Sequence, residues 1–138
     1  MKTIFICLVI TFIFNYTYSQ TLSVQPKDKK DIGMSINEYS LHVNNADTLV
    51  LVYFKANWCE ICKKLKPTVE QVFAERKGFI KLYEIDTDEN PKINDYFEID
   101  GLPVLVLYKN GQIVWSYVGL LSKTSILDNL DTYQYRLK

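Results

Sequence analysis

Two closely spaced cysteines are the residues of this 138-residue chain that are best suited to chemistry. Cys59 and Cys62 are separated only by Glu60 and Ile61. Because the apolar pattern becomes helical after Trp58, both cysteines are predicted to open a helix, and three-residue spacing puts their sulfurs on one face. The pair is therefore suited to thiol–disulfide exchange, in which one thiol attacks a disulfide and the second resolves the mixed disulfide.

The two cysteines are expected to have different roles. At a helix N-terminus, free backbone N–H groups and the positive end of the dipole stabilise a thiolate, so Cys59 is predicted to be the nucleophile. Cys62 lies one turn deeper and suits the resolving role. The charge of Glu60 opposes ionisation of Cys59, whereas Lys63 and Lys64 oppose the effect of Glu60. We therefore expect a moderately activated Cys59, which favours a reductant or electron carrier over an oxidant.

Two other interpretations of the cysteine pair were weighed. A structural zinc site needs four ligands, and after residue 19 only His42 adds a possible His or Cys ligand to the two cysteines, so neither a metal nor another cofactor is expected. A passive local disulfide in a non-catalytic domain stays open as an alternative. A CxxC pair that follows a strand in an alternating α/β pattern is nevertheless typical of redox proteins.

The elements around the pair predict an α/β fold. The apolar run at 49–54 is rich in β-branched residues and reads as a central strand buried on both faces. Asn110 and Gly111, between two β-rich runs, predict a hairpin. This order predicts a central mixed sheet with helices on both faces. The predicted elements are a helix at 36–43 capped by Ser35, strands at 49–54, 79–85, 104–108 and 113–118, and helices starting at Cys59, at Pro91 and after Ser122.

Composition and charge limit the class of protein. The chain has 48% hydrophobic and 23% charged residues, which suits one globular domain. Sixteen Lys and Arg residues balance sixteen Asp and Glu residues. With no net positive field, nucleic acid is not expected as a partner.

The first 19 residues match a secretory signal peptide. Lys2 precedes an apolar run at 3–14 and a polar stretch that ends with Ser19. The run is shorter than the roughly 20 residues of a membrane-spanning helix, although an uncleaved anchor stays open as an alternative. We expect cleavage between Ser19 and Gln20, a flexible segment at 20–34, a folded domain at 35–138, and a periplasmic or secreted location.

Motifs spread along the chain resemble those of the thioredoxin family, from about residue 49 to residue 130. The likeness depends on several motifs in a fixed order, and is more specific than CxxC alone. These motifs are the strand at 50–54 that leads into 56–62, Pro67, the pair Ile85 and Asp86, the run 101–103, the turn at 109–111, and the run 118–123.

The resemblance implies a substrate groove beside the sulfurs. Pro103 is expected to be a cis proline that faces the two cysteines, and the backbone of Leu102 to pair with a bound substrate segment. A strand-start proline remains the alternative for Pro103, and ordinary packing remains the alternative for Trp58 and Ile61. The expected apolar rim of the groove consists of Trp58, Ile61, Gly101 and Gly119.

The sequence also departs from the family pattern. Glu60 and Ile61 stand where thioredoxins usually have Gly and Pro. Tyr53 stands where many members bury an Asp that helps to deprotonate the resolving thiol, and Leu82 is predicted to take the place of the accompanying Lys. The proton of Cys62 is therefore expected to go elsewhere, such as to water.

The resemblance further implies how the protein acts. A compact plan without inserted domains is similar to the soluble thiol domains that take electrons from membrane transporters. We expect a monomer that acts on protein disulfides and is supplied by a membrane thiol-electron transporter. The alternative is a non-catalytic domain that holds extended polypeptide in the groove beside Pro103.

Overall fold

The computed structural model describes residues 33–44 and 48–135. The predicted signal peptide at 1–19 lies outside these residues, as does most of the predicted flexible segment at 20–34. Within the described part of the chain, every helix is too short or too polar to cross a membrane.

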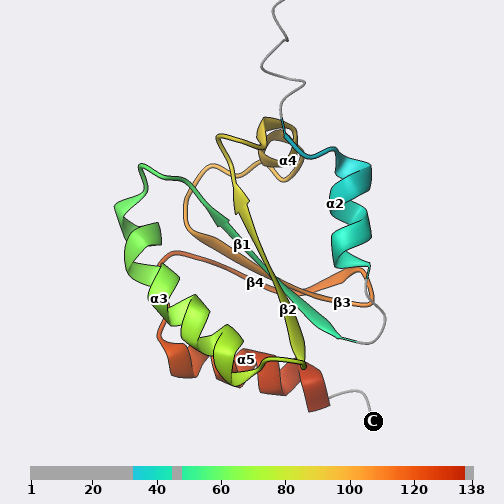
Figure 1. Cartoon of the computed structure of the whole chain (residues 1–138), viewed down its shortest axis with the longest axis vertical. Coiled ribbons are helices and arrows are strands. Elements are labelled where there is room, and N and C mark those ends of the chain that lie inside the picture. Colours follow the sequence, from blue (N-terminus) through green and yellow to red (C-terminus); the bar gives the residue numbers. More distant parts are fainter. Residues whose placement is uncertain (1–32, 45–47, 136–138) are drawn as a thin grey trace, which may run out of the picture.

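A four-stranded mixed sheet forms the centre of the molecule (Figure 1). Its strands are β1 (Leu49–Lys55), β2 (Ile80–Asp86), β3 (Val104–Lys109) and β4 (Gln112–Val118), in the spatial order β2-β1-β3-β4. β1 pairs with β2 in parallel, whereas β3 is antiparallel to both β1 and β4. The prediction of a mixed sheet with a central first strand is confirmed.

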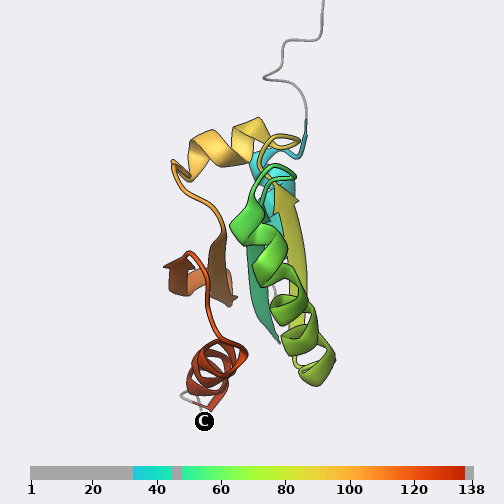
Figure 2. The same cartoon turned by 90° about the vertical axis from the view of Figure 1, so that its left-hand side faces the viewer.

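Helices cover both faces of the sheet. They are α2 (Ile36–Val43), α3 (Glu60–Glu75), α4 (Pro91–Tyr96) and α5 (Lys123–Tyr135). Residues of α3 and α5 share one apolar cluster with the sheet, and residues of α2 and α4 share the other. Figure 2 looks onto the α3 side, with α2 behind the strands.

Alternation along β1 explains why both faces need a cover. Side chains of a strand point to opposite faces in turn, so an apolar run without polar positions must be buried on both sides. Residues 49, 51 and 53 lie in the cluster with α3 and α5, and residues 50, 52 and 54 in the cluster with α2 and α4. All six are at most 4% exposed.

Local signals fix the ends of several elements. The Ser35 side chain accepts a hydrogen bond from the Glu38 N–H and caps α2. Asn110 and Gly111 both have positive φ, which a two-residue hairpin turn between β3 and β4 requires. β2 starts one residue later than predicted, because Phe79 belongs to a turn in which its N–H donates to the Arg76 carbonyl.

Candidate active site

The two cysteines form a disulfide at the start of α3. The Cys59 and Cys62 Cα atoms are 5.2 Å apart. Cys59 is the N-cap residue of the helix, and its sulfur accepts a hydrogen bond from the Cys62 N–H at 3.1 Å. This donor is one of the N–H groups that a helix start leaves without a backbone partner. It can therefore stabilise a negative charge on the Cys59 sulfur.

Exposure does not distinguish the two cysteines in this oxidised form. Cys59 is 5% exposed and Cys62 is 3% exposed. Their predicted roles as nucleophile and resolving thiol therefore depend on the cap position of Cys59 and on the surroundings of each sulfur.

Three strand ends bring the groove residues to the cysteines. β1 runs into the loop before Cys59, and its residue Phe54 pairs with Val104 at the start of β3. Val104 in turn pairs with Val118 at the end of β4. The segments at 58–62, 101–103 and 118–119 therefore lie at one edge of the sheet, although up to 60 residues separate them in sequence.

The predicted cis proline is present. The Leu102–Pro103 peptide bond is cis, and the buried Pro103 lies directly before β3. Its carbonyl oxygen accepts a hydrogen bond from the Gly119 N–H at 2.8 Å. Gly119 has a φ of 110°, a backbone conformation that favours glycine, so the residue type matches its place beside the proline.

Exposed apolar side chains surround this edge. Trp58 is 67% exposed and Ile61 is 47% exposed, so neither is an ordinary core residue. Val118 and Leu120 on either side of Gly119 are also exposed and were not predicted as rim residues. Because they flank Gly119, which was predicted as a rim residue, the sequence could have indicated both of them.

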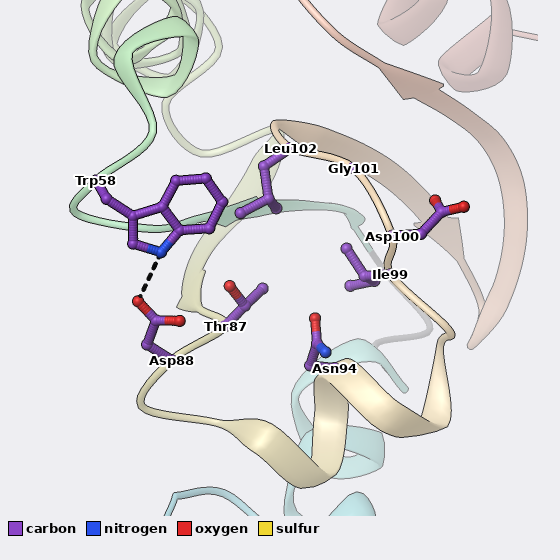
Figure 3. Close-up of a pocket in the computed structure, with 8 residues that line it drawn as sticks. All are labelled: Trp58, Thr87, Asp88, Asn94, Ile99, Asp100, Gly101 and Leu102. Atoms are coloured by element: carbon purple, nitrogen blue, oxygen red, sulfur yellow. Dashed lines mark hydrogen bonds between the residues drawn. The ribbon is translucent and has the colours of Figure 1, made fainter.

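Trp58 is held by a carboxylate that the sequence did not single out. Its indole N–H donates to Asp88 Oδ2 at 2.9 Å (Figure 3). A cavity of about 220 Å³ opens beside this contact, and we call it the acidic pocket. Its lining residues are Trp58, Thr87, Asp88, Asn94, Ile99, Asp100, Gly101 and Leu102.

Glu60 and Lys63 form an exposed ion pair next to the disulfide. Lys63 Nζ donates to Glu60 Oε1 at 2.6 Å. The hydrogen bond and the charge of Lys63 lower the pKa of the Glu60 carboxyl, with a smaller contribution from Lys64. Glu60 is thus negative at neutral pH, and Lys63 offsets part of that charge beside Cys59.

Tyr53 occupies the place behind the resolving cysteine. Its side chain is fully buried, and its hydroxyl donates to the Cys62 backbone carbonyl at 2.7 Å. Burial, with a contribution from the charge of Glu84, raises the pKa of Tyr53 to about 12. The phenol is therefore neutral at physiological pH and holds the first turn of α3 against β1.

The neighbours of Tyr53 on the adjacent strand are Glu84 and Leu82. In the parallel register of β1 and β2, Tyr53 pairs with Glu84, whereas Leu82 pairs with Leu51. Leu82 packs against the same apolar cluster as Tyr53, so no cation from this position accompanies Tyr53. Glu84 is the register partner of Tyr53, and its Oε2 atom lies 3.9 Å from Lys55 Nζ.

A second cavity, of about 180 Å³, reaches Cys62, and we call it the lysine cavity. Three ammonium side chains contribute to its wall, and the described lining residues include no Asp or Glu. Lys55 is the least exposed of the three, with 23% of its side chain accessible, and its Nζ also lies 3.9 Å from Asp86 Oδ2. The lining residues are Tyr53, Lys55, Ala56, Asn57, Cys62, Lys63 and Lys66.

Comparison with known proteins identifies the family. The Thioredoxin family model matches residues 32–132. Thioredoxin of Rickettsia felis is 37% identical over 92 residues, which cover 67% of this chain and 88% of that protein. Thioredoxin 1 of Nostoc sp. is 34% identical over 95 residues, which cover 69% of this chain and 89% of that protein.

A solved structure supports the same assignment. The crystal structure of chloroplastic thioredoxin z matches with a TM-score of 0.65 and 29% identity, covering 72% of this chain and 89% of that one. The fold, the disulfide at the start of α3 and these relatives agree with one another. The chain belongs to the thioredoxin family and is a thiol–disulfide oxidoreductase.

Proposed function

We propose that the protein is an exported, monomeric reductant or electron carrier that acts on protein disulfides through Cys59 and Cys62. The observation that carries this proposal is the sulfur of Cys59 at the N-cap of α3, bonded to Cys62 and hydrogen-bonded to its N–H. A reduced Cys59 in that position is stabilised as a thiolate, which is the attacking species in disulfide exchange.

The reaction proceeds in two exchanges. The Cys59 thiolate attacks one sulfur of a substrate disulfide, that S–S bond breaks, and the departing substrate thiolate takes a proton from water. Cys62 then loses its proton to water and attacks the Cys59 sulfur. The Cys59–substrate bond breaks, the second substrate thiol is released, and two electrons have passed from the dithiol to the substrate.

The groove supplies the substrate site of this proposal. Pro103 lacks an N–H, and the Leu102 segment precedes β3, so its backbone is available to an extended chain. The exposed side chains of Trp58 and Ile61 flank this position as an apolar rim, together with Gly101 and Gly119. An extended polypeptide with a disulfide fits such a surface.

The direction of electron flow follows from the charge next to Cys59. A strong oxidant must stabilise its reduced thiolate strongly. Glu60 is ionised beside Cys59 and is neutralised only in part by its exposed pair with Lys63. The thiolate is therefore stabilised moderately, which supports a reducing or electron-carrying role.

Export is proposed from the pattern at 1–19, with a membrane thiol-electron transporter as the source of electrons. Cleavage near Ser19 would release the chain into the periplasm or the medium. N-terminal sequencing of protein recovered from the cell envelope is expected to give a start at Gln20. Full-length protein with Met1 in the cytosol would contradict export.

An insulin-reduction assay tests the activity. The wild-type chain is expected to accelerate reduction, and Cys59→Ser to lose the acceleration, because serine provides no thiolate. If the wild type and Cys59→Ser gave the same slow rate, the alternative of a non-catalytic polypeptide-binding domain would be supported instead.

A further inference from the structure

We propose that the acidic pocket binds a Lys or Arg side chain of the substrate, so that disulfides flanked by a basic residue are reduced preferentially. This inference rests on the proposed function and names its substrate class. The observation behind it is the cavity beside Trp58 (Figure 3). The two exchange steps do not require this cavity.

The pocket lies where a bound substrate must pass. One wall is Trp58, the residue before Cys59, and another is formed by Gly101 and Leu102, directly before the cis Pro103. The remaining residues come from the segment after β2, from α4 and from the segment that follows α4. A chain that lies along Leu102 with its disulfide at Cys59 therefore has a neighbouring side chain at the mouth of the pocket.

The chemistry of the lining selects a cation. Asp88 supplies a carboxylate, the side chain of Asp100 in the same wall points outward (Figure 3), and among the described lining residues there is no Lys or Arg. Thr87 and Asn94 add neutral oxygen atoms that can accept hydrogen bonds. A carboxylate or phosphate in this pocket would meet like charge without a compensating group, whereas an ammonium or guanidinium would be attracted.

The contact between Trp58 and Asp88 prepares the pocket for such a group. The indole N–H donates to Asp88 Oδ2 and fixes the carboxylate in place. The carboxylate can still accept further hydrogen bonds. The indole, together with the apolar side chains of Ile99 and Leu102, provides a surface for the methylene stem of a long basic residue. The carboxylate and the apolar wall thus match the two parts of a Lys or Arg side chain.

The size of the cavity favours a single side chain. About 220 Å³ is below the roughly 300–1,000 Å³ that is usual for small-molecule sites. The occupant is therefore better described as one residue of a polypeptide than as a separate ligand.

Matched disulfide peptides test the proposal. A parent peptide carries Gln at the residues around its disulfide, and each member of a series replaces one Gln by Lys. With reduced full-length protein at low ionic strength, we expect the best Lys peptide to be reduced about fivefold faster than the parent, measured as kcat/KM. At about 1 M salt, where screening acts within roughly 3 Å, the ratio is expected to fall toward one.

Variants of the pocket test whether its acidic residues cause the preference for Lys peptides over Gln peptides. In Asp88→Asn combined with Asp100→Asn, the ratio between Lys and Gln peptides is expected to drop to about one, while asparagine still offers Trp58 an acceptor. The control is Asp128→Asn on the exposed surface of α5, which removes one carboxylate elsewhere and is expected to keep the wild-type ratio.

The outcomes separate this inference from the proposed function. Equal rates for all peptides with the wild type, or a ratio that survives in the double variant, would overturn the pocket assignment while leaving the oxidoreductase intact. If the wild type reduced none of the peptides, the proposed function would be wrong, and this inference with it.

Discussion

The acidic pocket and the lysine cavity differ in the sign of the charge that they bring to one redox centre. The acidic pocket includes Trp58, next to Cys59, and its lining residues include two acids, of which Asp88 is bonded to Trp58. The lysine cavity includes Cys62 and holds three ammonium groups. The two cavities share no lining residue. The lysine cavity thus reaches Cys62 itself, whereas the acidic pocket reaches Cys59 only through its neighbour Trp58.

This difference indicates how Cys62 can lose its proton without a buried acid behind it. A positive field favours the thiolate over the thiol, so water can serve as the proton acceptor. The field is moderated, because each of the three lysines has an acidic neighbour. Lys63 is paired with Glu60, Lys66 lies 3.8 Å from Glu70, and Lys55 Nζ lies 3.9 Å from both Glu84 Oε2 and Asp86 Oδ2. Lys55 is the most enclosed of the three lysines, so a change of its charge is the least screened by solvent.

The largest effect is expected from removing the sulfur that faces the lysine cavity. In Cys62→Ser, Cys59 still attacks a substrate disulfide, but no second thiol resolves the product. Turnover is expected to fall by about 100-fold or more, and the mixed disulfide to accumulate on Cys59. Mass spectrometry of the protein after incubation with a disulfide peptide measures the adduct. Adduct on Cys62 in the matched Cys59→Ser variant at a similar rate would remove the distinction between the two roles, and a faster rate would reverse it.

The hydroxyl behind Cys62 is expected to matter for stability. Tyr53→Phe removes the bond to the Cys62 carbonyl and is expected to lower the free energy of unfolding by about 1 kcal/mol at pH 8, measured by urea titration. The pKa of Tyr53 in the fold is raised to about 12 from an unfolded value of 10.0. Stability gained from the neutral phenol is therefore complete below pH 10 and is lost as the pH rises through 12.

The Tyr53→Phe variant also tests that pH dependence. Between pH 10 and 12 the wild type is expected to lose stability more steeply than the variant, since the variant has no phenol at this position. Parallel curves for the two proteins would show that the buried hydroxyl does not titrate in the fold as proposed.

A smaller effect is expected from the charge of the lysine cavity. Lys55→Met is expected to slow the release of substrate from the mixed disulfide by about threefold at neutral pH, because less Cys62 is ionised once no cation offsets Glu84 and Asp86. The groups that face Cys62 across the cavity are Tyr53, Lys63 and Lys66, and these are unchanged in the variant. Stopped-flow measurement across a range of pH is expected to show the release step shifted to higher pH.

Two matched variants show whether charge is the cause. Lys55→Arg keeps the cation near Glu84 and Asp86 and is expected to restore the rate. Lys81→Met removes an exposed lysine of β2 that does not line the cavity and is expected to have no effect on release. If the Met and Arg variants at residue 55 were equally slow, packing rather than charge would be responsible.

The smallest effect is expected from Glu60→Gln. Removing this charge stabilises the Cys59 thiolate and makes the protein slightly more oxidising, with a shift of less than about threefold in the equilibrium with glutathione. Lys63 lowers the pKa of the Glu60 carboxyl, so Glu60 keeps its charge as the pH falls through the range in which a Glu usually takes up a proton. The difference between the wild type and Glu60→Gln is therefore expected to disappear only in stronger acid. An unchanged equilibrium and an unchanged Cys59 titration would remove the argument from Glu60.

The parts of the site that depend on local sequence were predictable. The helix start at Cys59 and the turn at Asn110 and Gly111 each follow from residue types within a few positions, whereas the cis bond before Pro103 was expected from the family resemblance. The buried alternation of the run at 49–54 likewise implied helices on both faces of the sheet. Local chemistry was therefore sufficient to predict the fold class and the reactive pair.

The acidic pocket joins segments that are distant in sequence, and the carboxylates of β2 beside Lys55 also come from a distant segment; neither was predicted. The register of β2 on β1 is set after a long crossover through α3, with no tight turn to fix it, so the position of Glu84 beside Tyr53 could not be counted from the sequence. The same holds for the bond from Trp58 to Asp88, which spans 30 residues. The charges around each sulfur are thus a property of tertiary structure.

The sulfur of Cys59 has a second task as the cap of α3, and this makes the neighbouring amide a built-in reporter. Reduction, alkylation or attachment to a substrate changes the acceptor that the Cys62 N–H sees, so its NMR chemical shift and its exchange with deuterated solvent follow the chemistry of the sulfur directly. Serine is a good N-cap residue whereas alanine is not. Replacement by serine therefore silences the reaction while preserving the helix start, and replacement by alanine removes both.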